Sequence, residues 1–367
     1  MANRATMKGS LFLGRISGIK IFIHWTFLIL IFWIIGSGVA RGLDTIAILW
    51  YLAFVMAIFA CVVLHELGHA LTAKQYHIPT KDITLLPIGG LARFEKLPEE
   101  PKKELIIAIA GPIVNFVIAG IIYIFWNKVS FSPEELQVIT PDNFIFMFMS
   151  INLFIGLFNL IPAFPMDGGR ILRAALSFKM DRVKATGIAS KIGQVLAIGF
   201  VFLGFFANIF LILIGIFVYL GARAEAEHVQ SQSLLKNYFV RDVIITDYYK
   251  LHPDDTIETA IQMMLSSQAK DFLVIDAHNA VAGTLSRNQI IKALAEAGKN
   301  TPVAGAMDKE VVTLNPEQPL EEFYTKIRQY RDKLFPVMEN GNLIGVLDAD
   351  NIMEFLMVRQ ATKSFET

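Results

Sequence analysis

The sequence contains a single cysteine, Cys61, among 367 residues. One cysteine excludes an intramolecular disulfide and is typical of a reducing compartment. Charged residues are also scarce, at 18% against 54% hydrophobic residues, and this imbalance excludes an ordinary soluble domain. The charges cancel, and no basic run is long enough to follow a phosphate backbone. We therefore expect a membrane protein without a nucleic-acid partner.

Long apolar runs lie almost entirely within residues 1–225, whereas residues 240–367 mix polar and apolar positions. A bilayer core requires about 20 apolar residues per helix. The runs predict six transmembrane helices: near 21–40, 46–73, 104–126 and 143–161, and two in a hairpin over 188–222 that turns near 206–208. The predicted fold is multi-domain. It comprises a polytopic α-helical membrane domain (1–228), a linker (229–240) and an α/β part made of two small domains (241–298 and 304–362).

Lysine and arginine residues are distributed unevenly between the predicted loops. Those before the first span, between the second and third spans, and around residues 170–191 fall on one side of the lipid bilayer. The opposite loop, 128–142, has three acids and one lysine. Because basic loops stay on the cytoplasmic side, we expect a multi-pass protein of the cell membrane. Both termini and the aqueous part are predicted to be cytoplasmic.

Two histidines and a glutamate occur near the cytoplasmic end of the second predicted span, as His65, Glu66 and His69 in an H-E-x-x-H run. On a helix, the two histidines lie one turn apart on one face, where both imidazoles can bind one Zn²⁺. Glu66 then lies close enough to deprotonate the water of this ion. It is the only acid between Asp44 and Asp82, and an ionisable group in a membrane helix is costly unless it has a function.

A catalytic zinc usually takes three protein ligands, and the third has one candidate, Asp167. It is the only acid between Asp142 and Asp181, and it follows an apolar helix that Pro162 and Pro165 must end. Unwound backbone at membrane depth is tolerated where protein or a water-filled cavity surrounds it. This segment can therefore bring a carboxylate to the depth of the histidines. The alternative is an ordinary turn acid at a helix end.

The three ligands and Glu66 together predict hydrolysis. Zinc lowers the pKa of bound water to about 7 and polarises a carbonyl group, while Glu66 accepts the proton of the water and returns it to the leaving amine. The amides of Asn115 and Asn159 can donate hydrogen bonds to the developing oxyanion or to an extended substrate. For each asparagine, the alternative is a hydrogen bond between helices of the bundle.

Residues 83–94 are apolar, interrupted by Pro87, Gly89 and Gly90, and too few to cross a bilayer. They predict a re-entrant hairpin near 82–95. Its edge, with Gly89 and Gly90, can pair with a substrate backbone and hold it extended near the metal. An ordinary interfacial loop is the alternative. Residues 11–24 alternate enough to predict a second short hairpin.

Three motifs resemble, in order, those of the site-2 protease family of intramembrane zinc metalloproteases. They are H-E-L-G-H in an apolar helix, A-G-P-x-x-N at 110–115 and N-x-x-P-x-x-P-x-D-G-G at 159–169. The resemblance implies one Zn²⁺ per chain, held by His65, His69 and Asp167, and Glu66 as the catalytic base. It also implies that Asn115 and Asn159 face the active site. Its implied substrates are single-pass transmembrane proteins, cleaved by regulated intramembrane proteolysis.

The aqueous part contains an internal repeat, in which L-H-P at 251–253 recurs as L-N-P at 314–316. Each copy has the pattern strand, helix, two strands, helix, and is too small to bury its own faces, so the two should pair. The repeat resembles tandem CBS domains, which bind adenine nucleotides between their repeats. Ser286 and Asp348 occupy the nucleotide-contacting positions, although neither copy keeps the ribose-binding acid three residues later. ATP or AMP binding is one implied role; a purely structural module, or one that forms a homodimer, is the other.

A second class of function uses the same ligands. CBS pairs also accompany channels and transporters, and there His65, His69 and Asp167 would line a path for divalent metals. Glu66 discriminates between the two classes, because hydrolysis needs a base beside the ligands and transport does not. The favoured interpretation is an intramembrane zinc endopeptidase with a CBS pair. A CBS-regulated divalent-metal transporter is the alternative.

Overall fold

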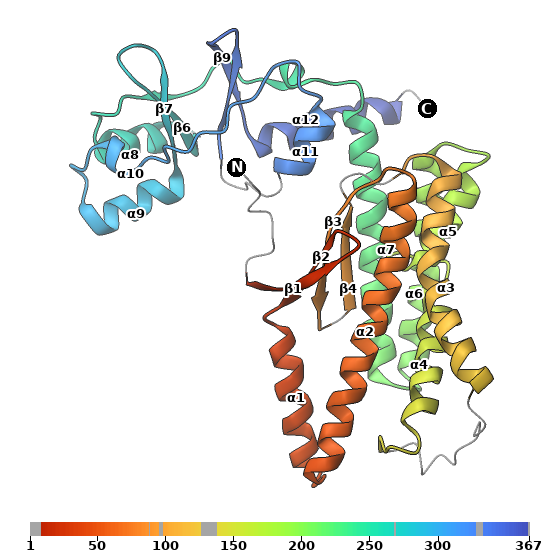
Figure 1. Ribbon diagram of the computed structural model, residues 1–367. Coiled ribbons are helices and arrows are strands. Elements are labelled where there is room, and N and C mark those ends of the chain that lie inside the picture. Colours follow the sequence, from red (N-terminus) through yellow and green to blue (C-terminus); the bar gives the residue numbers. More distant parts are fainter. Residues whose placement is uncertain are drawn as a thin grey trace. The chain divides into compact units, whose positions relative to one another are not determined.

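The structure of the chain is a computed structural model that describes residues 9–87, 89–94, 98–125, 138–267, 269–327 and 333–365. The chain divides into two compact units, Met1–Val229 and Gln230–Thr367. Figure 1 shows the first unit as long helices with a small sheet beside them and the second as a mixture of short helices and strands. This division agrees with an apolar helical part followed by an α/β part.

Helices dominate the first unit, and the described ones are α1 (Phe27–Ala40), α2 (Thr45–Gln75), α3 (Pro101–Phe125), α4 (Phe144–Asn159), α5 (Asp167–Ser177), α6 (Arg182–Gly204) and α7 (Ile209–Leu235). Among the described residues, α2, α3, α6 and α7 are long and apolar enough to cross a membrane. With 14 and 16 residues, α1 and α4 rise only about 21 and 24 Å, less than the roughly 30 Å of hydrocarbon. Helix length therefore supports four transmembrane spans among the described residues, and the count of six spans stays a prediction.

Side-chain caps set two of the helix starts. The Asp44 carboxylate accepts a hydrogen bond from the backbone N–H of Ala47 at 2.8 Å and caps α2. Asp181 caps α6 in the same way through the N–H of Lys184, at 3.0 Å. Each cap satisfies one of the backbone donors that a helix start leaves unpaired. α2 ends just before His77, whose φ of 60° is left-handed and cannot continue the helix.

The first predicted span, 21–40, is wrong at its start, because residues 19–24 form a strand. β1 (Ser10–Ile16) and β2 (Ile19–His24) pair in antiparallel fashion, and α1 begins only at Phe27. Ser17 and Gly18 join the strands with φ values of 51° and 89°. Positive φ at both central residues matches the right-handed twist of a two-residue hairpin. The hairpin predicted from the alternation of residues 11–24 is confirmed.

A four-stranded sheet packs against α2. β3 (Thr80–Leu86) pairs in parallel with β2 and in antiparallel fashion with β4 (Gly89–Phe94), giving the order β1-β2-β3-β4. Ile83 of β3 packs with Leu67 and Ala70 of α2, which fixes the sheet on the helix that carries the histidines. β3 and β4 form a hairpin over the described part of 82–95, and its re-entry into the membrane stays a prediction. Among the described strands β4 pairs only with β3, so it is an edge of the sheet.

A compact loop joins α4 to α5. α4 ends at Asn159, α5 begins at Asp167, and two prolines lie between them. A Cβ at Gly168 would lie 2.1 Å from the carbonyl oxygen of Ile161, so the first turn of α5 rests directly on the loop. α7 also lies against the loop, because a Cβ at Gly221 would lie 2.7 Å from Cδ of Pro165. The loop therefore holds Asp167 in a fixed place.

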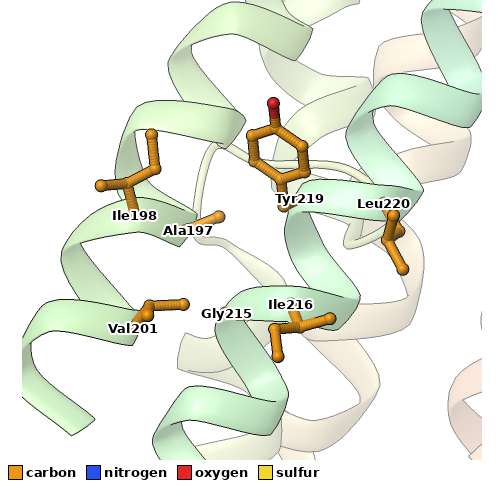
Figure 2. Close-up of a pocket in the computed structure, with 7 residues that line it drawn as sticks. All are labelled: Ala197, Ile198, Val201, Gly215, Ile216, Tyr219 and Leu220. Atoms are coloured by element: carbon orange, nitrogen blue, oxygen red, sulfur yellow. The ribbon is translucent and has the colours of Figure 1, made fainter. Parts of the chain in front are cut away.

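Figure 2 shows an apolar hollow between α6 and α7. It is lined by Ala197, Ile198, Val201, Gly215, Ile216, Tyr219 and Leu220. The lining offers no carboxylate, imidazole or amine, so the hollow is not a site for hydrolytic chemistry. Ile198, Ile216 and Leu220 are large and exposed, as the lipid-facing surface of a membrane helix requires.

The second unit repeats one pattern twice. The first copy contains β5 (Lys250–Leu251), α8 (Ile257–Ser266), β6 (Asp271–Ile275), β7 (Val281–Ser286) and α9 (Arg287–Ala297), and the second contains α11 (Leu320–Ile327), β8 (Phe335–Glu339), β9 (Asn342–Leu347) and α12 (Ala349–Phe365). The short helices η1 (Val240–Val243) and α10 (Val303–Ala306) precede them. The first strand of the second copy is reduced to one bridge, Leu314 to Val337. The predicted repeat pattern is otherwise present in full.

The two copies share a core, as expected for units too small to stand alone. Leu273 and Ile275 of the first copy pack with Leu334 and Val346 of the second. Segment 229–240, predicted to be a linker, also contributes to the core of the second copy, because Leu235 and Val240 are fully buried there.

Candidate metal centre

The three predicted metal ligands meet at one point. His65 and His69 lie on one face of α2, and Asp167 is the first residue of α5. All three are buried, at 6%, 3% and 7% exposure. The Nε2 atoms of the histidines are 3.1 Å apart, and Oδ2 of Asp167 lies 3.2 Å from the first and 3.1 Å from the second. The fold thus places the aspartate against the two histidines.

The other ring nitrogen of each histidine faces an oxygen. Nδ1 of His65 lies 2.6 Å from Oδ1 of Asn115, and Nδ1 of His69 lies 2.7 Å from the carbonyl oxygen of Ile107. Because these oxygens accept, each Nδ1 carries the proton and each Nε2 presents a lone pair toward Asp167. Two lone pairs and a carboxylate oxygen that converge at 3.1–3.2 Å are favourable neighbours only around a cation.

The spacing and the donor set fit zinc. A tetrahedral Zn²⁺ with ligands at about 2.0–2.1 Å separates its ligand atoms by about 3.3 Å, close to the distances between these three atoms. Imidazole nitrogen and carboxylate oxygen are common ligands of this ion. Gly111 of α3 keeps the site open, because a Cβ there would lie 2.2 Å from Nε2 of His69 and 2.7 Å from Nε2 of His65. A side chain at position 111 would therefore displace the two imidazoles.

Two asparagine side chains, Asn115 and Asn152, form a hydrogen-bonded chain that ends at His65. Nδ2 of Asn115 donates to Oδ1 of Asn152 on α4 at 3.0 Å, and Nδ2 of Asn152 donates to the carbonyl oxygen of Phe148 at 2.8 Å. Both asparagines are fully buried. Because the chain ends on a carbonyl that can only accept, the direction of every hydrogen bond back to His65 is fixed. Sequence reasoning missed Asn152, although an amide in the middle of an apolar helix was the available signal.

The predicted base lies beside the edge strand. Glu66 is half-buried on α2, and a Cβ at Gly90 would lie 2.8 Å from its Cγ atom. β4 can pass this close only because residue 90 is glycine. Gly89 needs glycine for a different reason, since its φ is 138°, which side chains rarely tolerate. Both glycines predicted to bind substrate thus lie on the edge strand, and Gly90 lies beside Glu66.

Asn159 lies apart from this hydrogen-bonded cluster. It ends α4, is half-buried, and its Nδ2 donates to the carbonyl oxygen of Ile155 one turn earlier, at 3.0 Å. A contact between Asn159 and substrate stays a prediction.

In the second unit, Ser286 and Asp348 occupy equivalent places at helix starts. Ser286 caps α9, where Gln289 completes a reciprocal pair of hydrogen bonds with it. Asp348 accepts a hydrogen bond from the N–H of Asn351 at 2.7 Å, at the start of α12. Capping explains both residue types without a ligand, so nucleotide contact stays a prediction.

Helices of membrane-spanning length that carry a buried metallopeptidase ligand set define a membrane zinc metalloprotease. The chain belongs to peptidase family M50, the site-2 proteases. The profile of this family matches residues 53–135 and 127–200, and the CBS domain profile matches 240–296 and 303–358.

Individual relatives agree with the family. A zinc metalloprotease of Methanocaldococcus jannaschii is 35% identical over 353 residues, which cover 96% of this chain and 97% of that one. Stage IV sporulation protein FB of Bacillus subtilis is 32% identical over 42% of this chain and 48% of its own length. The solved site-2 protease from M. jannaschii is 40% identical over 59% of this chain and 95% of that chain, with a TM-score of 0.44. On the two profile matches and the 35% identical relative, the chain is a zinc metalloprotease with tandem CBS domains, and the transporter alternative is not favoured.

Proposed function

We propose that this metalloprotease cleaves single-pass transmembrane proteins within or near their membrane segments, in regulated intramembrane proteolysis. The observation that carries the proposal is the place of the ligand set. His65 and His69 lie on α2, one of the described helices of membrane-spanning length, and both side chains are buried within the unit. A peptide bond that reaches such a site is one already held in or beside the membrane.

Each residue has a distinct role in this proposal. His65, His69 and Asp167 would hold a zinc ion, which would supply Lewis acidity and an acidified water. Glu66 accepts the proton and returns it to the leaving amine. Asn115 holds His65 in orientation rather than touching substrate, because both ends of its amide are already bonded.

The edge of β4 presents the substrate. A transmembrane helix must unwind before its amide can be attacked, and an extended segment can add to an open strand edge through backbone hydrogen bonds. Gly89 and Gly90 lie on that edge, and Gly90 lies beside Glu66, so a paired peptide would run next to the base. Asn159 is the proposed side-chain donor to this extended peptide.

The test compares the membrane proteomes of cells that carry the native protein and Glu66→Gln. Glu66→Gln keeps the ligands, so the zinc content of the purified protein should stay at one per chain. Uncleaved single-span precursors should accumulate in the variant cells. Normal cleavage by Glu66→Gln would refute the role of the base, and loss of metal transport without a change in any precursor would favour the transporter.

For the CBS pair we propose a regulatory or dimerising role. Ile291 and Leu294 on α9 and Met353 and Met357 on α12 are large apolar side chains exposed on the second unit. Burial of such side chains against a second copy is the expected use of this surface. Light scattering of the purified protein should give a homodimer, and Met357→Asp should give a monomer if α12 forms the interface.

Nucleotide binding is proposed at Ser286 and Asp348, which begin equivalent helices in the two copies. ATP or AMP should then raise the thermal unfolding temperature of the full chain, and Ser286→Ala should reduce this increase. An unchanged unfolding temperature at saturating AMP and ATP would leave the pair with a structural role only.

Both termini and the CBS pair are proposed to be cytoplasmic. The proposed domains are the membrane domain at 1–228 and the two CBS domains at 241–298 and 304–362. Cys61 is the only cysteine and is buried. Cysteines introduced at either end should therefore react with a membrane-impermeant reagent only after the cells are opened. Labelling of these cysteines in intact cells would show that the termini lie outside the cell and would contradict the proposed topology.

A further inference from the structure

A second buried polar cluster lies in the membrane unit and contains none of the metal ligands. Arg173 on α5 is fully buried. Its Nε and Nη2 donate to Oε1 of Glu104 on α3 at 2.9 and 2.5 Å, and its Nη1 donates to Oε1 of Glu225 on α7 at 2.5 Å. Arg182, at the start of α6, donates to the other oxygen of Glu104 at 3.1 Å. Two arginines and two glutamates balance, as buried charge requires.

Arg173 of this cluster contacts the segment that carries Asp167. The guanidinium of Arg173 lies over the ring of Phe164, 5.0 Å from its centroid. Phe164 is buried three residues before Asp167, and Gly169 rests on it, because a Cβ at Gly169 would lie 2.6 Å from the backbone nitrogen of Phe164. Arg173 therefore contacts the loop before Asp167 and also belongs to the helix that follows it.

The same cluster reaches the helix that orients His69. Glu104 lies in the first turn of α3, and Ile107, three residues later, supplies the carbonyl oxygen that accepts from Nδ1 of His69. One guanidinium thus joins the helix that carries Asp167 to the helix that fixes His69. A buried ion pair is weak support for stability as such, because apolar replacements often fold as well. The ion pair joins α5, which carries Asp167, to α3, which orients His69, and this placement indicates a role in positioning the metal ligands.

We propose that Arg173 is a positioning residue for the metal ligand Asp167, anchored by Glu104 and Glu225. The inference rests on the proposed ligand set. Without the guanidinium, α5 loses its ion pairs to Glu104 of α3 and Glu225 of α7, and the α4–α5 loop loses the contact of Phe164 with Arg173. The carboxylate of Asp167 then moves relative to the imidazoles, and metal affinity falls while the ligands themselves remain.

The test measures zinc affinity and coordination geometry in the full-length protein in detergent. All forms carry Glu66→Gln, so that turnover plays no part. Zinc dissociation constants come from competition with a chromophoric chelator, and Co²⁺ absorption spectra report the ligand geometry. Arg173→Met should weaken zinc binding about 10–100-fold, the usual effect of removing support behind a ligand, and should alter the Co²⁺ spectrum.

The matched control is Arg223→Met. Arg223 pairs with Glu227 on the surface of α7, where both side chains are mostly exposed. It should leave the zinc dissociation constant and the Co²⁺ spectrum unchanged. Glu225→Gln is the second test variant in case Arg173→Met does not fold, because Glu225 is partly exposed and glutamine keeps its size. It should weaken zinc binding in the same direction but less.

Asp167→Asn separates this inference from the ligand assignment. If Asp167→Asn weakens zinc binding while Arg173→Met, or Glu225→Gln in its place, leaves the affinity and the Co²⁺ spectrum unchanged, the positioning role is overturned and the ligand set stands. If Asp167→Asn binds zinc as tightly as the native residue does, the ligand set itself is wrong and the inference falls with it.

Discussion

Nδ1 of His65 lies 2.6 Å from Oδ1 of Asn115, and this contact decides which ring nitrogen faces the metal. The acceptor oxygen keeps the proton on Nδ1, so the lone pair of Nε2 points toward Asp167. Asn115 is itself held by Asn152, 37 residues further along the chain. The orientation of one ligand therefore depends on three helices, α2, α3 and α4.

Replacement of Asn152 by leucine should weaken zinc binding without removing a ligand. Leucine has a similar volume but cannot accept from Asn115, whose buried amide then lacks a partner and no longer fixes His65. We expect zinc affinity to fall about 10–100-fold, measured by chelator competition. Asn208→Leu, on the exposed turn between α6 and α7, is the control and should bind zinc as the native protein does. Equal zinc affinities for the two variants would show that Asn152 does not support the metal site.

Gly111→Ala should abolish zinc binding. Its Cβ would lie 2.2 Å from Nε2 of His69, closer than any side chain can approach. Gly120→Ala is the matched control on the same helix, because nothing lies within 4 Å of the Cβ there. Elemental analysis should give no zinc for the first variant and one zinc per chain for the second. A full complement of zinc in Gly111→Ala would mean that the metal binds elsewhere.

Gly90→Ala should remove cleavage but keep the metal. The added Cβ would meet Cγ of Glu66 at 2.8 Å, so either β4 or the base must move, whereas the ligand atoms are untouched. Gly14→Ala on β1 adds a Cβ in open space within the same sheet and should cleave normally. The measurement pairs zinc content with precursor accumulation in cells. Normal cleavage by Gly90→Ala would show that the close approach of β4 to Glu66 is not needed for catalysis.

Asp348→Ala should lower the stability of the second unit by about 0.5–2 kcal/mol, the usual cost of losing a helix cap. Its carboxylate accepts from the N–H of Asn351, which alanine leaves unpaired. Hydrogen exchange of the α12 amides in the full chain would report the loss. Asp348→Asn retains a capping oxygen and should behave as the native residue, so equal exchange in all three forms would contradict the capping role.

The ligand set could be predicted from the sequence because it follows from local spacing and from scarcity. His65 and His69 are one helical turn apart on any helix, and Asp167 is the only acid between Asp142 and Asp181. The β3–β4 hairpin also follows from local signals. The start of the first span did not, because the hairpin predicted over 11–24 and the span predicted over 21–40 overlap, and the shared residues belong to strand β2.

The supporting residues could not be predicted, because they depend on how distant helices approach. Gly111 and Gly90 matter through the side chains that face them across helix and strand contacts, which spacing along the chain does not reveal. Asn152 belongs to no motif. The sequence contains Arg173, Glu104 and Glu225, yet nothing in it says that they pair.

The central claim is that one zinc ion is bound by two imidazoles and one carboxylate between α2 and α5. X-ray absorption at the zinc edge, on purified Glu66→Gln protein with one zinc per chain, tests it most directly. We expect imidazole scattering from two histidines and a first shell of nitrogen and oxygen at about 2.0–2.2 Å. A shell that contains sulfur, or one without imidazole scattering, would contradict it.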